Sequence, residues 1–428
     1  MHWPDRPGSL ALRSTFGLLF SEDAGESWDW VCERAVGYSG TQDPMLAPMA
    51  DGVLLAALNE GIARSDASAC SWSFANADVA GWPIIDLSVK RSDSRTAFAL
   101  AWDPSNDDGS AAYRARLLVT EDNGQNFATL PAGLDPSVLV MTIDLAPSDA
   151  RRVYLSGVRS TDAGRTGVFL VSRDGAQSFS SHAVPFETGV DQGVYIAAVD
   201  PNDADTVYLR TSSASVGRLI VTKDGGTSFS TAFTGSPLLA FALTPDGRDL
   251  YFGGANGIYA GSADELAFEQ RSSLRCLCLT ATEDTLYACS DEYNGFTLGA
   301  SRDGGFSFDP KLHLKTVRGP LACADDTPAA SCAAEWQGIR TLLGIMPEMA
   351  DGGAGGAPEP GTSGAAGTAG SGDAGAPDTS TGGTGPTAAP EDRAGGGGCV
   401  LGASAPRPGF GAVLTFLLAL AWVSRRCR

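Results

Sequence analysis

TKDGGTSF, residues Thr222–Phe229, is one copy of a short phrase that recurs along this chain of 428 residues. Four more copies share its form: SEDAGESW (Ser21–Trp28), TEDNGQNF (Thr120–Phe127), SRDGAQSF (Ser172–Phe179) and SRDGGFSF (Ser301–Phe308). Each copy begins with a hydroxyl residue, carries an aspartate two places later and ends in an aromatic residue. Repetition with a period of roughly 20–50 residues is typical of proteins built from repeated structural units.

Apolar runs surround each copy in a regular order. Two runs joined by a polar turn precede most copies, as in VLVMTIDLAPSDARRVYLSGV from Val138. A third run, such as GRLIVT from Gly217, leads into the phrase, and a fourth follows it. Such runs, bounded by Asp, Pro, Gly and Ser, predict antiparallel hairpins. Four short strands in each unit of about 40–55 residues predict an all-β β-propeller with four-stranded antiparallel blades.

Two weaker copies bring the number of units to seven. SDASACSW (Ser65–Trp72) lacks the aspartate and glycine at their usual places, and SADELAF (Ser262–Phe268) is one residue short in the turn. Both stand where the period requires a unit, so we expect seven blades, with six or eight as alternatives.

The N-terminus predicts an incomplete first blade. We expect the third strand of this blade at residues 14–20, and the few residues before it leave no room for a first hairpin. A signal peptide is also missing, because Asp5 and Arg13 interrupt any apolar run. Together these features suggest a start site placed too late in the chain.

The phrase resembles the Asp-box, or BNR repeat, S/T-x-D-x-G-x-T/S-W/F, over about residues 15–312. Sialidases, xyloglucan-cleaving glycosidases, sortilin-type receptors and a photosystem assembly factor carry this repeat, and all are β-propellers with the boxes away from the active site. A short carboxylate can accept backbone N–H bonds within its own turn. We therefore expect a structural role, with no metal or catalysis, for the five aspartates: Asp23, Asp122, Asp174, Asp224 and Asp303.

Catalysis would need further groups. The resemblance to sialidases would imply an Arg-Ile-Pro signature in the first blades, which this sequence lacks. A glycosidase needs two carboxylates on loops, for which Asp291 and Glu292 are the candidates. Since the chain holds 50 acidic residues, such a pair is expected by chance. We favour binding of an extracellular glycan or protein over catalysis, with a sialidase- or xyloglucanase-like glycoside hydrolase as the alternative.

Charge and composition narrow the classes of partner. The formal net charge of −20 repels phosphate backbones, so nucleic acid is not expected as a partner. The chain has only three histidines and no Cys pair with CxxC spacing, so we expect no metal site. We expect no cofactor, and a monomer.

Nine cysteines predict disulfides formed in an oxidising compartment. A tight turn at Glu283–Asp284 places Cys278 opposite Cys289, at a cross-strand separation that suits a disulfide. We also expect Cys323 to pair with Cys332 and Cys32 with Cys70. Cys276 is then left unpaired.

The C-terminal part of the chain has a different character. We expect a propeller at 1–345 that ends in a short helix within 332–344, then a disordered linker at 346–398 and an anchor segment at 399–428. Residues 351–398 contain no Leu, Ile, Val, Met or aromatic residue, so they cannot build a core.

The anchor segment contains Cys399, a fourteen-residue apolar run at 410–423, expected to be helical, and terminal arginines. It resembles the MYXO-CTERM sorting signal of myxobacteria. That resemblance implies cleavage near Cys399, lipid attachment there and display on the cell surface or outer membrane. A plain C-terminal transmembrane helix is the alternative, although about twenty residues are usual for one.

Overall fold

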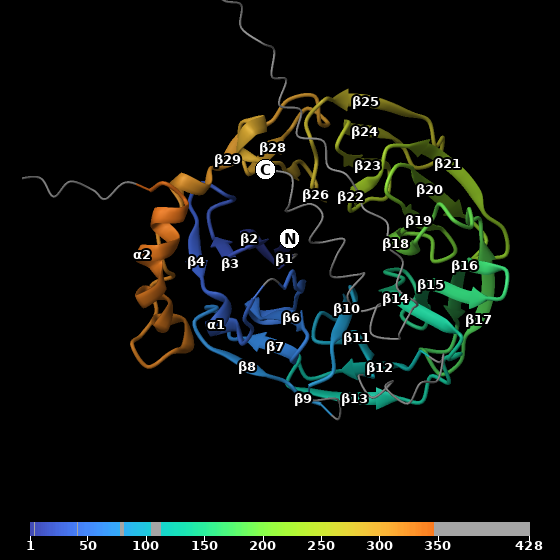
Figure 1. The fold of residues 1–428 in the computed structure, drawn as a ribbon, viewed down its shortest axis with the longest axis horizontal. Coiled ribbons are helices and arrows are strands. Elements are labelled where there is room, and N and C mark those ends of the chain that lie inside the picture. Colours follow the sequence, from blue (N-terminus) through green and yellow to red (C-terminus); the bar gives the residue numbers. More distant parts are fainter. Residues whose placement is uncertain (4, 41, 78–80, 104–112, 346–428) are drawn as a thin grey trace, which may run out of the picture. The chain divides into compact units, whose positions relative to one another are not determined.

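The computed structural model describes residues 1–345, except 4, 41, 78–80 and 104–112. The described residues form seven antiparallel sheets arranged around a common axis (Figure 1). Six of the sheets have four strands and one has five. The protein is therefore a seven-bladed β-propeller, as the repeat arithmetic predicts, and the alternatives of six or eight blades are wrong.

Blades are numbered in chain order. Within each blade the first strand lies nearest the axis and the fourth strand lies at the rim. Blades 1 to 3 contain β1 (His2–Trp3), β2 (Arg6–Ser14), β3 (Gly17–Ser21), β4 (Asp29–Val31); β5 (Met45–Pro48), β6 (Leu54–Leu58), β7 (Gly61–Ser65), β8 (Trp72–Phe74); and β10 (Ile84–Val89), β11 (Ala97–Trp102), β12 (Ala115–Thr120), β13 (Asn126–Leu130). The additional strand β9 (Asn76–Ala77) pairs in parallel with β13 at the rim of blade 3.

Blades 4 to 7 repeat the same order without additions. They contain β14 (Val138–Leu145), β15 (Val153–Thr161), β16 (Gly164–Ser172), β17 (Ser180–Val184); β18 (Gly193–Val199), β19 (Val207–Ser212), β20 (Gly217–Thr222), β21 (Ser230–Gly235); β22 (Leu238–Leu243), β23 (Asp249–Gly254), β24 (Gly257–Ser262), β25 (Phe268–Ser272); and β26 (Cys278–Ala281), β27 (Leu286–Cys289), β28 (Leu298–Ser301), β29 (Asp309–Leu312).

The first blade is not truncated, which corrects the expectation from the sequence. Its first hairpin is formed by β1 and β2, with Trp3 paired to Arg6 across a very short connection. Because β1 has only two residues and β2 carries polar residues at both ends, this hairpin lacks the alternating apolar pattern of the later blades.

The core lies between neighbouring blades. In β11 alternate side chains face opposite ways, so Ala97 and Ala99 pack with blade 2 while Phe98 and Leu100 pack with blade 4. Both faces of a blade are thus buried, and its middle strands are continuous apolar runs. Each blade is stabilised mainly by its two neighbours, so the ring is most vulnerable where the first and last blades meet.

We call this meeting of blades 1 and 7 the seam. No strand is exchanged across it, since each blade takes its four consecutive strands from one stretch of chain. The buried Trp28 crosses the seam, and its indole Nε1 donates to the Lys311 carbonyl at 3.0 Å. An ion pair between Lys311 and Glu26 joins the same two blades. These contacts between the two blades involve side chains, and the chain that follows blade 7 adds backbone hydrogen bonds to blade 1.

Residues 313–342, here called the clasp, run back from blade 7 over the outer strand of blade 1. The Trp30 N–H donates to the Gly319 carbonyl at 2.7 Å, and the Leu321 N–H donates to the Trp30 carbonyl at 2.8 Å. The predicted short helix is confirmed as α2 (Ala333–Leu342), and the Trp336 ring lies 5.5 Å from that of Trp30. The clasp also contains the 3-10 helices η4 (Leu314–Thr316) and η5 (Pro328–Cys332).

Two disulfides attach the clasp to blades 1 and 2, and they correct the predicted pairing. Cys32 is bonded to Cys332 with Cα atoms 5.3 Å apart, and Cys70 to Cys323 at 5.6 Å. Because the clasp lies against the first two blades, its cysteines meet partners there instead of each other.

The hairpin disulfide Cys278–Cys289 is confirmed, with a Cα separation of 4.8 Å. Cys276 is free among the described residues, also as predicted, and its side chain is buried. Between blades 1 and 2 lies α1 (Glu33–Val36), whereas η1 (Ala50–Gly52) and η3 (Glu292–Asn294) lie in loops within blades 2 and 7. Among the described residues, no helix combines the length and apolar character needed to cross a membrane.

Candidate functional site

The five phrase aspartates fasten turns between the third and fourth strands. In each turn the carboxylate Oδ1 accepts the backbone N–H four residues on, at 2.8–3.0 Å. Its Oδ2 accepts the side chain of that same residue, and the hydroxyl two residues earlier donates to Oδ1. All their hydrogen bonds are local, so the aspartates act on the turn itself.

These hydrogen bonds also set the ionisation of the aspartates. Bonds from Ser27, Ser178 and Ser228 lower the pKa of Asp23, Asp174 and Asp224 to about 2, and a bond from Ser307 lowers the pKa of Asp303 as well. Burial alone would raise the pKa of Asp122, but hydrogen bonds from its turn outweigh this effect. The aspartates are therefore ionised acceptors at neutral pH and cannot serve as general acids.

Replacing Asp122 with alanine is expected to lower the free energy of unfolding by about 1–2 kcal/mol, because the N–H groups of Gln125 and Asn126 lose their acceptor. Chemical denaturation measures this loss. The control is Asp162→Ala in the turn between β15 and β16, where the exposed carboxylate has no hydrogen bond among the described residues. Equal stability of the two variants would contradict the role of Asp122.

The phrase turns lie at the same end of the ring as the turns that join first and second strands. In blades 3 to 6 a backbone N–H of the phrase turn donates to a carbonyl of the other turn at 2.8–2.9 Å. We call this end of the ring the phrase face. The connections between second and third strands lie at the opposite end, because neighbouring strands are antiparallel.

Asp291 and Glu292, the candidates for a catalytic pair, lie at that opposite end, between β27 and β28. The Asp291 carboxylate caps η3 and forms an ion pair with Arg275 at 2.8 Å. Glu292 accepts from the Thr297 hydroxyl at 2.6 Å and from the Leu314 N–H at 2.8 Å, and it contacts His313 at 3.1 Å. Glu292 therefore holds the start of the clasp, and both carboxylates have structural partners.

Their ionisation agrees with this role. Burial opposes the charged forms, but bonds from Asn294 and Arg275 lower the pKa of Asp291, and bonds from Thr297 and Leu314 lower the pKa of Glu292. A glycosidase needs one carboxyl group whose pKa is raised so that it can act as an acid. Neither residue has that property.

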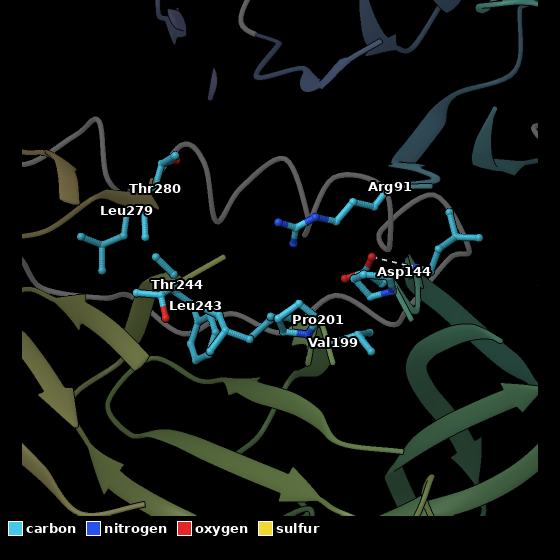
Figure 2. A pocket seen from close by; sticks show the side chains of 15 residues that line it. Arg91, Asp144, Val199, Pro201, Leu243, Thr244, Leu279 and Thr280 are labelled. Atoms are coloured by element: carbon cyan, nitrogen blue, oxygen red, sulfur yellow. Dashed lines mark hydrogen bonds between the residues drawn. The ribbon is translucent and has the colours of Figure 1, made fainter. Parts of the chain in front are cut away.

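A cavity of about 300 Å³ opens at the axis on the phrase face, a place that sequence reasoning did not identify. The carboxyl ends of four first strands line it, and Arg91 follows the first strand of blade 3. Besides Arg91, its labelled lining residues in Figure 2 are Asp144, Val199, Pro201, Leu243, Thr244, Leu279 and Thr280. Asp291 and Glu292 are not among its lining residues.

The cavity has a charged side and an apolar side. Figure 2 shows Arg91 extending toward the middle of the cavity from the side of Asp144. Leu243 and Leu279 belong to the walls supplied by blades 6 and 7. No ion pair or hydrogen bond occupies the Arg91 guanidinium among the described residues. An exposed, unpaired cation beside an apolar wall is a binding feature that the fold itself does not require.

Asp144 and its neighbour Asp86 are two acids at the axial strands of blades 4 and 3. Asp86 is buried, and its carboxylate accepts the N–H groups of Leu87 at 2.9 Å and Ile143 at 3.0 Å. The Asp144 Oδ1 accepts the Ser88 hydroxyl and the Leu145 N–H, whereas its Oδ2 has no partner among the described residues. Asp86 thus ties two blades together, while Asp144 keeps one oxygen available.

Burial shifts the ionisation of both acids. It raises the pKa of Asp86 to about 7, with a further contribution from the nearby Asp144 charge, and it raises the pKa of Asp144 to about 6. Asp144 is only partly buried and lines the cavity, so solvent moderates its rise more than that of Asp86.

Stability is expected to fall as the pH rises from about 4 to 7, because both acids hold their protons more tightly in the folded ring than in the unfolded chain. Thermal unfolding across this range measures the slope. Below about pH 4 the phrase aspartates have the opposite effect, since their pKa values are lowered on folding and their stabilisation is lost as they protonate.

The variant Asp144→Asn tests whether Asp144 contributes to this fall in stability with rising pH. It removes the charge while an amide oxygen can still accept from Ser88 and Leu145, so it should flatten the slope. We expect a gain of about 1–2 kcal/mol in the free energy of unfolding near pH 7, allowing for partial exposure. A variant whose slope matches the original would contradict the assignment.

Among the described residues, no group of three or more His, Cys, Asp or Glu side chains could hold a metal ion. Cys399, the linker and the C-terminal apolar run lie outside the described residues.

No protein-family model matches the chain, and no curated protein does. Among solved structures, the extracellular domain of a putative one-component system from B. thetaiotaomicron has a TM-score of 0.48 and 13% identity, covering 70% of this chain and 37% of that one. An ancestral GH74 enzyme has a TM-score of 0.45 and 18% identity, covering 62% and 37%. YCF48 bound to D1 peptide has a TM-score of 0.41 and 15% identity, covering 62% and 84%.

The chain spans little more than a third of the first two of these proteins. All three TM-scores are below 0.5, so the likenesses carry no argument about activity.

Proposed function

We propose that this propeller binds an extracellular ligand, a glycan or a protein, without transforming it. The observation that carries the proposal is the axial cavity of about 300 Å³, into which the unpaired Arg91 extends. Concave sites with a few convergent polar groups are the usual places where proteins bind ligands. The glycoside hydrolase alternative loses support, because Asp291 and Glu292 are both engaged in structural contacts.

Three disulfides among the described residues support a place outside the cytoplasm, where such bonds persist. We propose that the chain is displayed on the cell envelope by its C-terminal segment, with Cys399 as the site of cleavage and lipid attachment. Mass spectrometry of the mature protein tests this step. A C-terminus near Cys399 would support sorting, and an intact Arg428 would exclude it.

A glycan array and an affinity capture from envelope extracts, each paired with a turnover assay, test the binding function. We expect retention of one ligand class without release of reducing ends. Release that is abolished by Asp291→Asn or Glu292→Gln would overturn the non-catalytic assignment. A chain that retains neither class would overturn the binding function itself.

A further inference from the structure

The axial cavity has a chemical character that narrows its ligand. Its volume of about 300 Å³ is at the lower end for small-molecule sites, so it suits a compact molecule better than a length of polymer. The residues that line it from blades 5 to 7 are mainly of apolar type, and Leu243 is the most exposed of Val199, Leu243 and Leu279. A ligand there would bury an apolar body against these side chains.

Arg91 supplies a positive charge that the protein does not neutralise. The charge of a second arginine, Arg13, lowers the pKa of the axial Asp86. Arg13 is already paired with Asp43 at 3.1 Å, however, and donates to the Pro44 carbonyl. Burial, the terminal amino group and the Arg91 charge all lower the pKa of His2, so this neighbour is neutral at pH 7. The guanidinium of Arg91 is therefore the charge available to an anionic ligand.

Asp144 makes this charged side selective. Its free Oδ2 borders the cavity, so the carboxyl group can donate a hydrogen bond when protonated and repels an anion when ionised. Of the charged groups on blade 3, Asp86 is affected by the Asp144 charge, and Arg91 lines the same cavity. Tyr154 on β15 pairs in register with Asp144, and its hydroxyl donates to the Ala204 carbonyl. From β18, the uncharged Ala197 and Ala198 line the cavity.

We propose that the cavity binds a small organic anion with an aliphatic body, whose charged group pairs with Arg91 and meets the Asp144 carboxyl, while its body contacts Leu243 and Leu279. This inference rests on the cavity that carries the proposed function, but it goes beyond that function, because it assigns the cavity a small ligand that is neither a glycan nor a protein. It also predicts tighter binding at mildly acidic pH, where Asp144 becomes a hydrogen-bond donor.

The test uses the full chain and 1-hexanesulfonate, an anion whose charge does not change with pH. Ligand-observed NMR or calorimetry should show binding that is about tenfold or more tighter near pH 5 than near pH 8. Arg91→Gln should weaken binding about tenfold or more at both values, as expected for loss of a charge-assisted contact. Asp144→Asn should bind near pH 8 about as tightly as the original protein binds near pH 5.

Controls separate this site from general attraction. Arg248→Gln changes an exposed arginine in the corresponding turn of blade 6, where it already pairs with Asp246, and should bind as the original protein does. Hexylammonium should not bind. Unchanged affinity in Arg91→Gln, with a melting temperature like that of the original, would overturn the inference.

The inference and the proposed function can fail separately. Absence of hexanesulfonate binding alongside retention of a glycan or protein ligand would overturn the anion site and leave the binding function standing. Binding of hexanesulfonate that depends on Arg91, with no macromolecular ligand retained, would support the anion site and overturn the proposal of a glycan or protein ligand.

Discussion

Replacing all four cysteines of the two clasp disulfides, Cys32, Cys70, Cys323 and Cys332, with serine is expected to lower the free energy of unfolding by about 5 kcal/mol or more. The two disulfides join residues 300 and 253 positions apart, so without them the unfolded chain gains much conformational freedom. Because domains are stable by only about 5–15 kcal/mol, the ring should become marginal. Denaturant unfolding of the oxidised proteins measures the effect.

Variants that lack a single clasp disulfide should lose about 2–4 kcal/mol each. Either bridge alone still holds the clasp on the ring, so the fourfold variant should lose more than the sum of the two. The matched control is removal of Cys278–Cys289, which closes a loop of only 11 residues and should cost less than both clasp bridges together. Additive losses would show that the two bridges do not support each other.

Trp28→Ala is expected to destabilise the protein by about 3–5 kcal/mol, the usual cost of truncating a fully buried aromatic side chain. Trp28 is 1% exposed and lies at the seam between blades 1 and 7. Its loss would leave a cavity where the ring has no exchanged strand to hold it closed. Thermal and denaturant unfolding measure the loss, and amide exchange should increase first in β3 and β28.

A pair of milder variants separates packing from the hydrogen bond across the seam. Trp28→Phe removes bonds to the Gly25 and Lys311 carbonyls, whereas Trp72→Phe at the corresponding place in blade 2 removes only the bond to Ala69. Trp28→Phe should therefore cost about 1 kcal/mol more than Trp72→Phe. Equal costs would mean that the contact with Lys311 adds nothing to closure.

Residues near one another in the chain account for most of what could be predicted. The five phrase aspartates were assigned to turns because each has its partners within four residues. The Cys278–Cys289 bridge was predictable for the same reason, since a tight hairpin sets its geometry. The prediction of an incomplete first blade was wrong, because β1 is too short to show a strand pattern in the sequence.

The candidate site was largely beyond the reach of the sequence. Asp291 and Glu292 attracted attention as adjacent acids in a loop, but the clasp gives Glu292 a structural partner from 22 residues away. Arg91 and Asp144 were not candidates, because 53 positions separate them in the chain and neither belongs to a motif. The basic pair Lys90–Arg91, which follows the axial strand β10, is the one signal that could have marked Arg91.

The sequence by itself determined the repeating blade, the turn chemistry and the number of units, because these depend on hydrogen bonds and apolar alternation within each unit of about 40–55 residues. Tertiary structure alone decided the partners of Cys32 and Cys70, the role of Glu292 and the composition of the axial cavity. These features appear only when the ring closes and brings distant segments together. No periodic pattern specifies contacts between residues so far apart in the chain.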